Sequence, residues 1–349
     1  MNNKSNTNNN EESDNNWRKL FSKREQLFFN LIKNLVNFIY SKSETSKEIN
    51  WLNIPGLISL LNATIHEIRT RHVKAYPPQL KEIFKLFVNV PEIPNSLIKE
   101  VTGKTNLYDV PGIFNLFDII NSVFDEYATL YPNTIFLKFN YNLLNQVVIL
   151  LFKEDHSLCV SKVLLFYYNC AHLMPVSHIG ELCQNIYFSK FYYYFFHWSF
   201  EIRDKFYYFI LYIIGHRLKD SRPYQDIEDL KFIKNLKTTE YIGVNIHKSF
   251  GDILDLKFSL IKELQNIITI EHSDPTFNNV INEDKYSYIL KQLPAEIHKN
   301  IVVSLHHFDK IFNEFKEFKE DNRRKKIKDI IYPKLELIPP KDDYIEYVK

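Results

Sequence analysis

The stretch FYYYFFHWSFEIRDKFYYFILYI, residues 191–213, decides the fold class of this chain. Apolar and aromatic side chains fall on nearly every side of a helix drawn through it, which is typical of a helix buried at the centre of a protein. His197 and Ser199 interrupt the stretch, and serine is a preferred residue just before a helix begins. The stretch therefore predicts two packed helices, 191–197 and 200–218, in an all-α protein.

The rest of the chain carries the same helical periodicity. Apolar segments at 135–152, 158–173 and 179–188 predict helices before the stretch, and few segments alternate apolar and polar residues as a half-buried strand would. Prolines fit the first turn of a helix, and they open earlier amphipathic segments at Pro55, Pro77, Pro94 and Pro111. We expect an irregular stack of helix pairs, either an armadillo- or HEAT-like α-solenoid or a large helical bundle.

Three regions are expected within the 349 residues. Residues 1–16 are rich in asparagine and should form a disordered tail. Residues 17–330 should form a single helical domain, of which 133–219 is the most characteristic part. Prolines between 331 and 349 predict an extended or disordered tail. The first helix of the domain should bury one face, formed by Leu20, Phe21, Leu27, Phe28, Leu31, Leu35 and Phe38.

Charge and composition narrow the class of protein. The 44 basic and 42 acidic residues leave a net charge of +2, which argues against nucleic acid as the partner. Cys159, Cys170 and Cys183 do not make the even disulfide framework that secreted proteins carry. No uncharged run of eighteen residues is apolar enough to predict a transmembrane segment. We expect a cytoplasmic protein, with a nuclear or a peripheral membrane location as alternatives.

Two segments of the chain resemble a known family. They are EDHSLCVSKVLLFYYNCAHLMP at 154–175 and the stretch at 191–213, whose shared pattern consists of Phe195, His197, Trp198, Ser199, Ile202 and Arg203. Over residues 154–218 the chain resembles domain-of-unknown-function family 1765, an uncharacterised eukaryotic family with no established enzymatic activity. The segment SFEIRDKFYYF also looks like the second helix of a HEAT-type repeat. Both resemblances imply stacked helix pairs rather than a catalytic site.

His197, Trp198, Ser199 and Arg203 are the candidate structural or interaction residues. In a structural role, Ser199 would cap a helix and Trp198 would be largely buried beneath it. Arg203 would join neighbouring helices through backbone carbonyls or a carboxylate, because its planar fork makes several directed hydrogen bonds. In a binding role, Trp198 would anchor a partner and Arg203 would bind a carboxylate or a phosphate. We predict the structural role.

Two other patterns resemble ligand sites without meeting their requirements. The segment VTGKT at 101–105 ends like a phosphate-binding loop, but Ile98 stands where that motif needs a glycine. The second pattern consists of Cys170, His172, His178 and Cys183. These residues lack the paired spacing of a structural zinc site, so we interpret them as buried thiols and helix-end histidines.

Charged and histidine-rich segments near the C-terminus are expected on a solvated helix. His306 and His307 point in different directions from a helix, so with Asp309 they predict ordinary surface residues. Basic residues at 323–328 are balanced by nearby acidic ones at spacings of three and four residues. A nuclear-import signal is the alternative interpretation of that run.

The sequence favours a non-catalytic protein that binds other proteins, as an interaction or scaffold protein. It assigns no catalytic, cofactor-binding or metal-binding residue, and we expect no cofactor. The first alternative is a peripheral membrane protein that uses aromatic residues around 188–209 and the basic run near Arg323. The second is an enzyme whose site is assembled only in three dimensions.

Overall fold

The computed structural model describes residues 25–42, 53–72, 76, 78–132, 134–218, 255, 257–266, 291, 293, 295–325 and 330–337. Most of these residues are helical and none of them lies in a strand, so the all-α prediction is confirmed. The predicted tail at 1–16, the end of the tail beyond 337 and residues 326–328 of the basic run lie outside the described residues. No helix in the described ranges is both long enough and apolar enough to cross a membrane.

The chain divides into two compact units. The first contains the described residues of Met1–Thr134 together with Lys138–Leu143, and the second contains those of Ile135–Leu137 and Leu144–Pro339. The boundary therefore falls inside a helix, α7 (Tyr141–Glu154). The limits of the expected helical domain, 17 and 330, stay a prediction.

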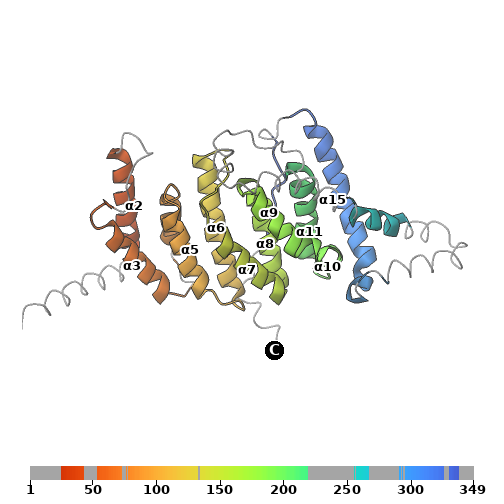
Figure 1. Ribbon diagram of the computed structural model, residues 1–349, viewed down its shortest axis with the longest axis horizontal. Coiled ribbons are helices and arrows are strands. Elements are labelled where there is room, and N and C mark those ends of the chain that lie inside the picture. The colour runs from red at the N-terminus through yellow and green to blue at the C-terminus, as the bar shows by residue number, and fades with distance from the viewer. Residues whose placement is uncertain are drawn as a thin grey trace, which may run out of the picture. The chain divides into compact units, whose positions relative to one another are not determined.

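The first unit packs its helices in two rows. In one row α2 contacts α4 and α4 contacts α6, while in the other α3 contacts α5 (Figure 1). Pro78 is the first residue of α4 and Pro111 is the second residue of α6. In the first turn of a helix the missing N–H of proline costs no hydrogen bond. The helices are α2 (Glu25–Lys42), α3 (Leu57–Thr70), α4 (Pro78–Leu86), α5 (Glu92–Lys104) and α6 (Val110–Leu130).

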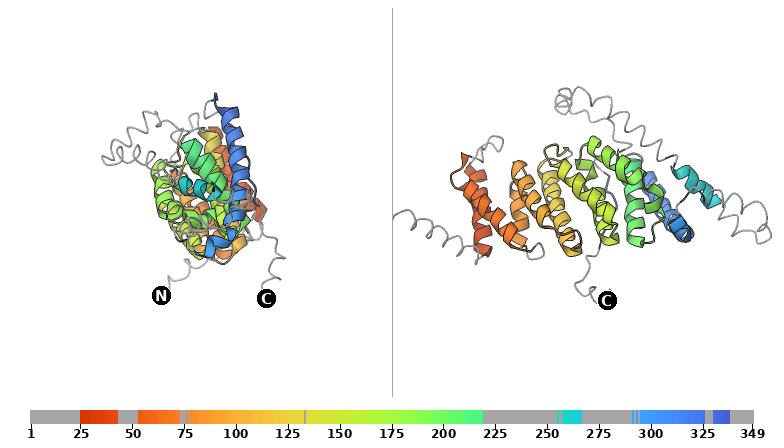
Figure 2. Two further views of the ribbon diagram at one scale, coloured as in Figure 1. Left: turned by 90° about the vertical axis from the view of Figure 1, so that its right-hand side faces the viewer. Right: turned by 60° about the horizontal axis from the view of Figure 1, so that its bottom comes forward.

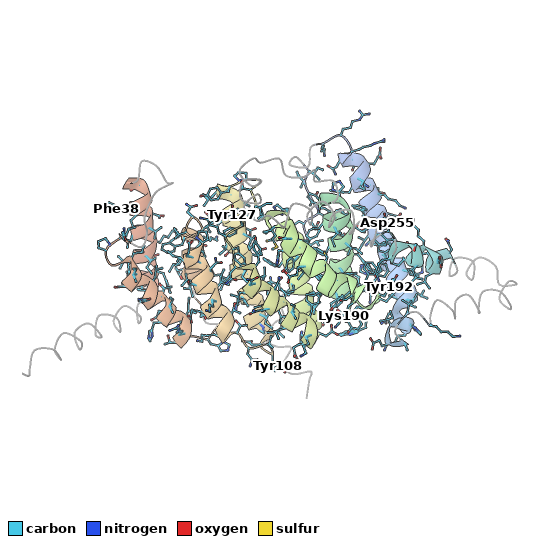
Figure 3. All side chains as sticks on the ribbon, viewed as in Figure 1. Phe38, Tyr108, Tyr127, Lys190, Tyr192 and Asp255 are labelled. Atoms are coloured by element: carbon cyan, nitrogen blue, oxygen red, sulfur yellow. The ribbon has the colours of Figure 1, made fainter. Side chains whose placement is uncertain are left out.

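The face that α2 buries differs from the predicted one. The helix buries a stripe centred on Phe29 and Ile32, whereas Leu27 and Leu31 are exposed, and so is Phe38 on the outer side of the helix (Figure 3). The prediction of one shared face was wrong because α2 has two apolar faces, and sequence periodicity alone does not select between them. The buried side chains are Phe28, Phe29, Ile32 and Val36.

The second unit is built around α11 (Phe200–Tyr208), which packs against α8 (Ser157–Cys170) and against α15 (Ile301–Asn322), the last helix among the described residues. Figure 2 shows α15, in blue, beside α11, in green. Aromatic rings fill the contact between α11 and α15, where the ring centroids of Tyr207 and Phe308 are 5.3 Å apart. The unit also contains η3 (Ala171–Leu173), α9 (Val176–Leu182), η4 (Cys183–Phe188), α10 (Phe191–Phe195), η5 (Phe209–Leu218) and η6 (Ala295–Asn300), and residues 257–266 are helical as well.

Two elements of this unit are π-helices, which the sequence did not predict. They are η4 and η5, and the ring centroids of Tyr187 in η4 and Phe209 in η5 are 4.8 Å apart. At the C-terminal end, residues 330–337 form neither helix nor strand, and Tyr168 donates a hydrogen bond to the carbonyl of Pro333 (2.8 Å). This contact holds part of the predicted tail against the unit.

Candidate functional site

The four candidate residues lie at the turn from α10 into α11. The end of α10 is held by Tyr207 of α11. The hydroxyl of Tyr207 donates a hydrogen bond that is shared between the carbonyls of Phe195 in α10 (2.6 Å) and Ser304 in α15 (3.2 Å). Tyr207 is buried, and its ring also contacts that of Phe195 at 4.7 Å. The turn is therefore attached to three helices, α10, α11 and α15.

Arg203 holds the turn from inside. Its guanidinium is buried, and the Nη1 group donates hydrogen bonds to the carbonyls of His197 and Trp198 (2.9 Å for Trp198). Burial lowers the pKa of this guanidinium. Backbone carbonyls were the expected acceptors, but both belong to the segment leading into the same helix, so Arg203 does not join neighbouring helices through them.

His197 forms a second link within the turn. Its Nδ1 accepts a hydrogen bond from the backbone N–H of Ser199 (3.0 Å), so in the neutral ring the proton is on Nε2. Nε2 lies 4.0 Å from Oδ2 of Asp155, within ion-pair range and beyond hydrogen-bond range. The ring is buried, and each of its nitrogens lies beside a group of the protein, Nδ1 beside the N–H of Ser199 and Nε2 beside Asp155.

Asp155 lies opposite His197 in the turn between α7 and α8. Its φ of 55° is in the left-handed region, which aspartate tolerates better than most residues. Burial raises the pKa of its carboxyl, but the nearby His197 ring and the hydrogen bond that it accepts from the Tyr193 hydroxyl outweigh burial and lower that pKa. Asp155 is thus a carboxylate at neutral pH.

The predicted burial of Trp198 was wrong. Trp198 is 65% exposed and Phe200 is 56% exposed, whereas His197 and Ser199 are 1% and 8% exposed. The backbone at Ser199 is extended (φ −73°, ψ 124°), and successive side chains of an extended segment point to opposite sides. His197 and Ser199 therefore point inward, and Trp198 and Phe200 point outward.

Ser199 occupies the expected cap position before α11, but its side chain makes no capping hydrogen bond. The N–H of Ser199 is instead bound by His197, and its carbonyl accepts the N–H of Arg203 (3.3 Å). The start of α11 is thus stabilised by backbone and histidine contacts in place of the usual hydroxyl cap.

Phe200 extends the exposed surface onto α15. Its ring stacks on that of His307, with centroids 4.3 Å apart and planes 11° apart. His307 Nε2 is also 3.2 Å from Oδ1 of Asp204. His307 is therefore a packed contact between α11 and α15, so its expected role as an ordinary surface residue was wrong. Val303 is exposed one turn earlier on the same face of α15. Trp198, Phe200 and Val303 are called the Trp198 surface below.

The patterns set aside in the sequence have structural roles. Lys104, in the segment that ends like a phosphate-binding loop, donates from Nζ to the carbonyls of Ile68 (3.0 Å), Arg69 and Arg71 at the end of α3. His178 lies 3.2 Å from the Tyr167 hydroxyl, and burial lowers its pKa to about 4. No group of three His, Cys, Asp or Glu side chains in the described part of the chain is arranged to hold a metal ion.

All three cysteines are buried thiols in the second unit. Burial raises the pKa of Cys159 to about 12, and it also raises that of Cys183. A thiol with so high a pKa is a poor nucleophile and a poor metal ligand at neutral pH, because both roles need the thiolate.

One comparison with known proteins identifies a segment of the chain. Residues 94–214 match a family model. The family is described as Protein of unknown function (DUF1765), so the resemblance seen in the sequence is confirmed; the matched segment extends back to residue 94 and ends at residue 214. The DUF1765 segment includes α6 to α11 and the whole turn with Trp198. No curated protein and no solved structure matches the chain.

Sequence reasoning found the turn but missed three of its members. Asp155 and Tyr193 were not connected with His197, and His307 was not connected with Phe200. A signal for the outward side chains was present: the order His-Trp-Ser-Phe alternates polar and aromatic residues over four positions, as an extended segment with one buried side does.

Proposed function

We propose that this chain is a non-catalytic protein-interaction protein and that the Trp198 surface anchors a protein partner. The observation that carries the proposal is the exposure of Trp198, 65%, on a turn whose backbone is held by buried Arg203 and His197. Tryptophan is enriched among the residues that contribute most to binding at protein interfaces. A large ring on a fixed backbone loses little conformational entropy on binding.

The chemistry of the partner follows from the surface. Trp198 and Phe200 need an apolar pocket, and the indole N–H of tryptophan needs a carbonyl or carboxylate acceptor at the rim of that pocket. His197 and Arg203 hold the turn and make no contact with the partner. Truncation of Trp198 therefore removes partner contacts, and truncation of Arg203 removes the support beneath them.

Proximity labelling in cells tests the proposal. The full chain, fused to a labelling enzyme, is compared with Trp198→Ala and with a matched control, Tyr108→Ala, which removes an exposed aromatic ring from the first unit. We expect a set of neighbouring proteins that is lost with Trp198→Ala and kept with Tyr108→Ala. Equal neighbour sets for all three chains would contradict the proposal, provided that each variant is expressed at the same level.

A membrane surface is the second candidate, because exposed tryptophan and phenylalanine side chains also suit a lipid interface. The carboxylates of Glu201 and Asp155 on and beside the turn argue against an anionic lipid surface. Sedimentation with neutral and with anionic lipid vesicles separates the two candidates. Vesicle binding that is lost with Trp198→Ala would favour the membrane and contradict the protein partner.

A further inference from the structure

The described residues that follow α15 lie against the second unit as a strap. Residues 330–337 form neither helix nor strand, and they are called the strap below. Tyr332, Pro333 and Leu335 are half-buried, whereas Ile331 is 88% exposed. The strap therefore presents one side to the unit and another to solvent.

Tyr332 anchors the strap to two elements. Its ring contacts those of Phe318 in α15 and His216 in η5, with centroids 5.4 Å and 5.9 Å apart. Its hydroxyl lies 3.1 Å from Nδ1 of His216, within hydrogen-bond distance. From α8, the Tyr168 hydroxyl donates a hydrogen bond to the carbonyl of Pro333 (2.8 Å). Phe318, His216 and Tyr168 are called the seat of the strap.

The seat contacts groups that any short peptide with the same two residues carries. A tyrosine supplies the ring for the aromatic contacts and the hydroxyl for His216, and the residue after it presents a carbonyl to Tyr168. Pro333 biases the backbone of Tyr332 toward an extended conformation, because proline disfavours helical geometry in the residue before it. Aromatic surfaces commonly bind proline-containing segments in this way, since a segment that is already extended loses little conformational entropy.

The strap is open to solvent on one side. A cavity of about 410 Å³ lies beside it, and its lining includes Ile331 of the strap, Tyr212 of η5 and Phe318 of α15. The side chains of Lys334 and Glu336 are 90% and 79% exposed. An open side of this kind lets a segment leave the seat while the helices stay folded.

We propose that the seat is a peptide-binding site for a tyrosine followed by a proline, and that the strap occupies it as an exchangeable ligand. The partner is then a protein that presents the same pair of residues in an exposed, extended segment and competes with the strap. Because the strap belongs to the same chain, its effective concentration at the seat exceeds that of a dilute free ligand. The strap therefore blocks weak ligands and admits strong ones. The seat shares no residue with the Trp198 surface, so the proposal does not rest on the role of that surface.

A protease site inserted between residues 327 and 328 of the full chain tests the proposal, since one cut turns the strap into a free ligand. The cut chain, with both pieces kept in the sample, is titrated against a fluorescent peptide of residues 328–339, and anisotropy reports binding. The peptide should bind the uncut chain at least about tenfold more weakly than the cut chain, because the attached strap fills the seat. Trp198→Ala in the cut chain should leave peptide binding unchanged, which separates the two sites.

Variants of the peptide define the ligand without any change to the protein. Tyr332→Ala in the peptide should weaken binding by about tenfold or more, because it removes the anchoring ring. Tyr332→Phe should weaken binding by a smaller factor, because it removes only the hydroxyl at His216. Ile331→Ala is the matched control, since it truncates the neighbouring exposed side chain and should bind like the parent peptide. Equal binding of the Tyr332→Ala and parent peptides would overturn the proposal.

Other outcomes would also overturn it. Loss of the circular dichroism signal after the cut would make the strap part of the core and not a ligand. Absence of peptide binding to the cut chain up to roughly 1 mM would mean that the seat does not hold a free segment. A dimer of the uncut chain that Tyr332→Ala abolishes would mean that the strap fills the seat of a second copy.

Discussion

At the residue scale, the turn at 197–200 shows how much a local pattern can hide. The sequence located the turn, its helix start and the buried arginine with carbonyl acceptors. It did not show that the backbone is extended at Ser199. Because of this extension, the His197 ring is buried and the neighbouring Trp198 ring is exposed. The partners of His197 and Phe200 come from distant segments, around 155 and 307, which local periodicity cannot connect.

Trp198 and Arg203 should differ sharply in their effect on stability. Trp198→Ala removes a mostly exposed ring, so the free energy of unfolding should change by less than about 1 kcal/mol. Arg203→Ala leaves two carbonyls without their donor and should cost about 2–4 kcal/mol. Arg203→Lys should recover part of that loss, because one ammonium cannot reproduce the planar fork. Urea unfolding measures all three, and a large loss for Trp198→Ala would contradict the exposed position.

Asp204 should make the stability of the second unit depend on acid. Burial raises the pKa of this carboxyl, but hydrogen bonds from His307 and Lys205 outweigh burial and lower it. A lowered native pKa stabilises the fold fully above the unfolded value, about 4, and this contribution is lost as the pH falls through the native pKa. The melting temperature of the parent should therefore fall more steeply below about pH 4 than that of Asp204→Asn. Parallel curves for the two proteins would contradict this role of Asp204.

At the element scale, the positions of most helices were predictable and the contacts between helices were not. The prolines and apolar segments predict most of the helices, because these signals are local. The choice of the buried face in α2 depends on where α4 lies, and the sequence of α2 offers two faces of similar apolar character. The widening of η4 and η5 into π-helices likewise left no pattern that we recognised.

The link between α3 and α5 gives a test at this scale. Lys104 supplies the last carbonyls of α3 with hydrogen bonds and a positive charge, which a helix C-terminus favours. Lys104→Met keeps the apolar stem and removes the ammonium, so the free energy of unfolding should fall by about 1–3 kcal/mol. Lys99→Met, at an exposed position of the same helix, is the control and should have little effect. Equal effects of the two changes would mean that the contacts of Lys104 contribute little.

At the scale of the whole molecule, the two units share a helix and a family segment. The boundary lies within α7, and residues 94–214 take in parts of both units. A helix that begins in one unit and ends in the other cannot remain half formed without losing hydrogen bonds and packing. We therefore keep the prediction of a single helical domain, and we expect that domain to unfold in one step.

Calorimetry with one core variant in each unit tests this cooperativity. Phe84→Ala removes a buried ring from the first unit and Phe206→Ala removes one from the second, and each should cost about 3–5 kcal/mol. If the chain unfolds in one step, both variants shift the same single transition by a similar amount. Two transitions, each shifted by one variant alone, would show that the units unfold separately.

The buried thiols make the rate at which the second unit opens measurable in the native protein. All three cysteines belong to the second unit, and burial keeps them out of reach of reagents. Burial also raises the pKa of Cys159 and of Cys183, which keeps these two thiols protonated at neutral pH. A thiol-labelling reagent can then react only in the moments when that unit opens, so the labelling rate counts openings. The first unit has no cysteine and stays silent in such an assay. Motion in one half can thus be timed in the native protein without an added probe.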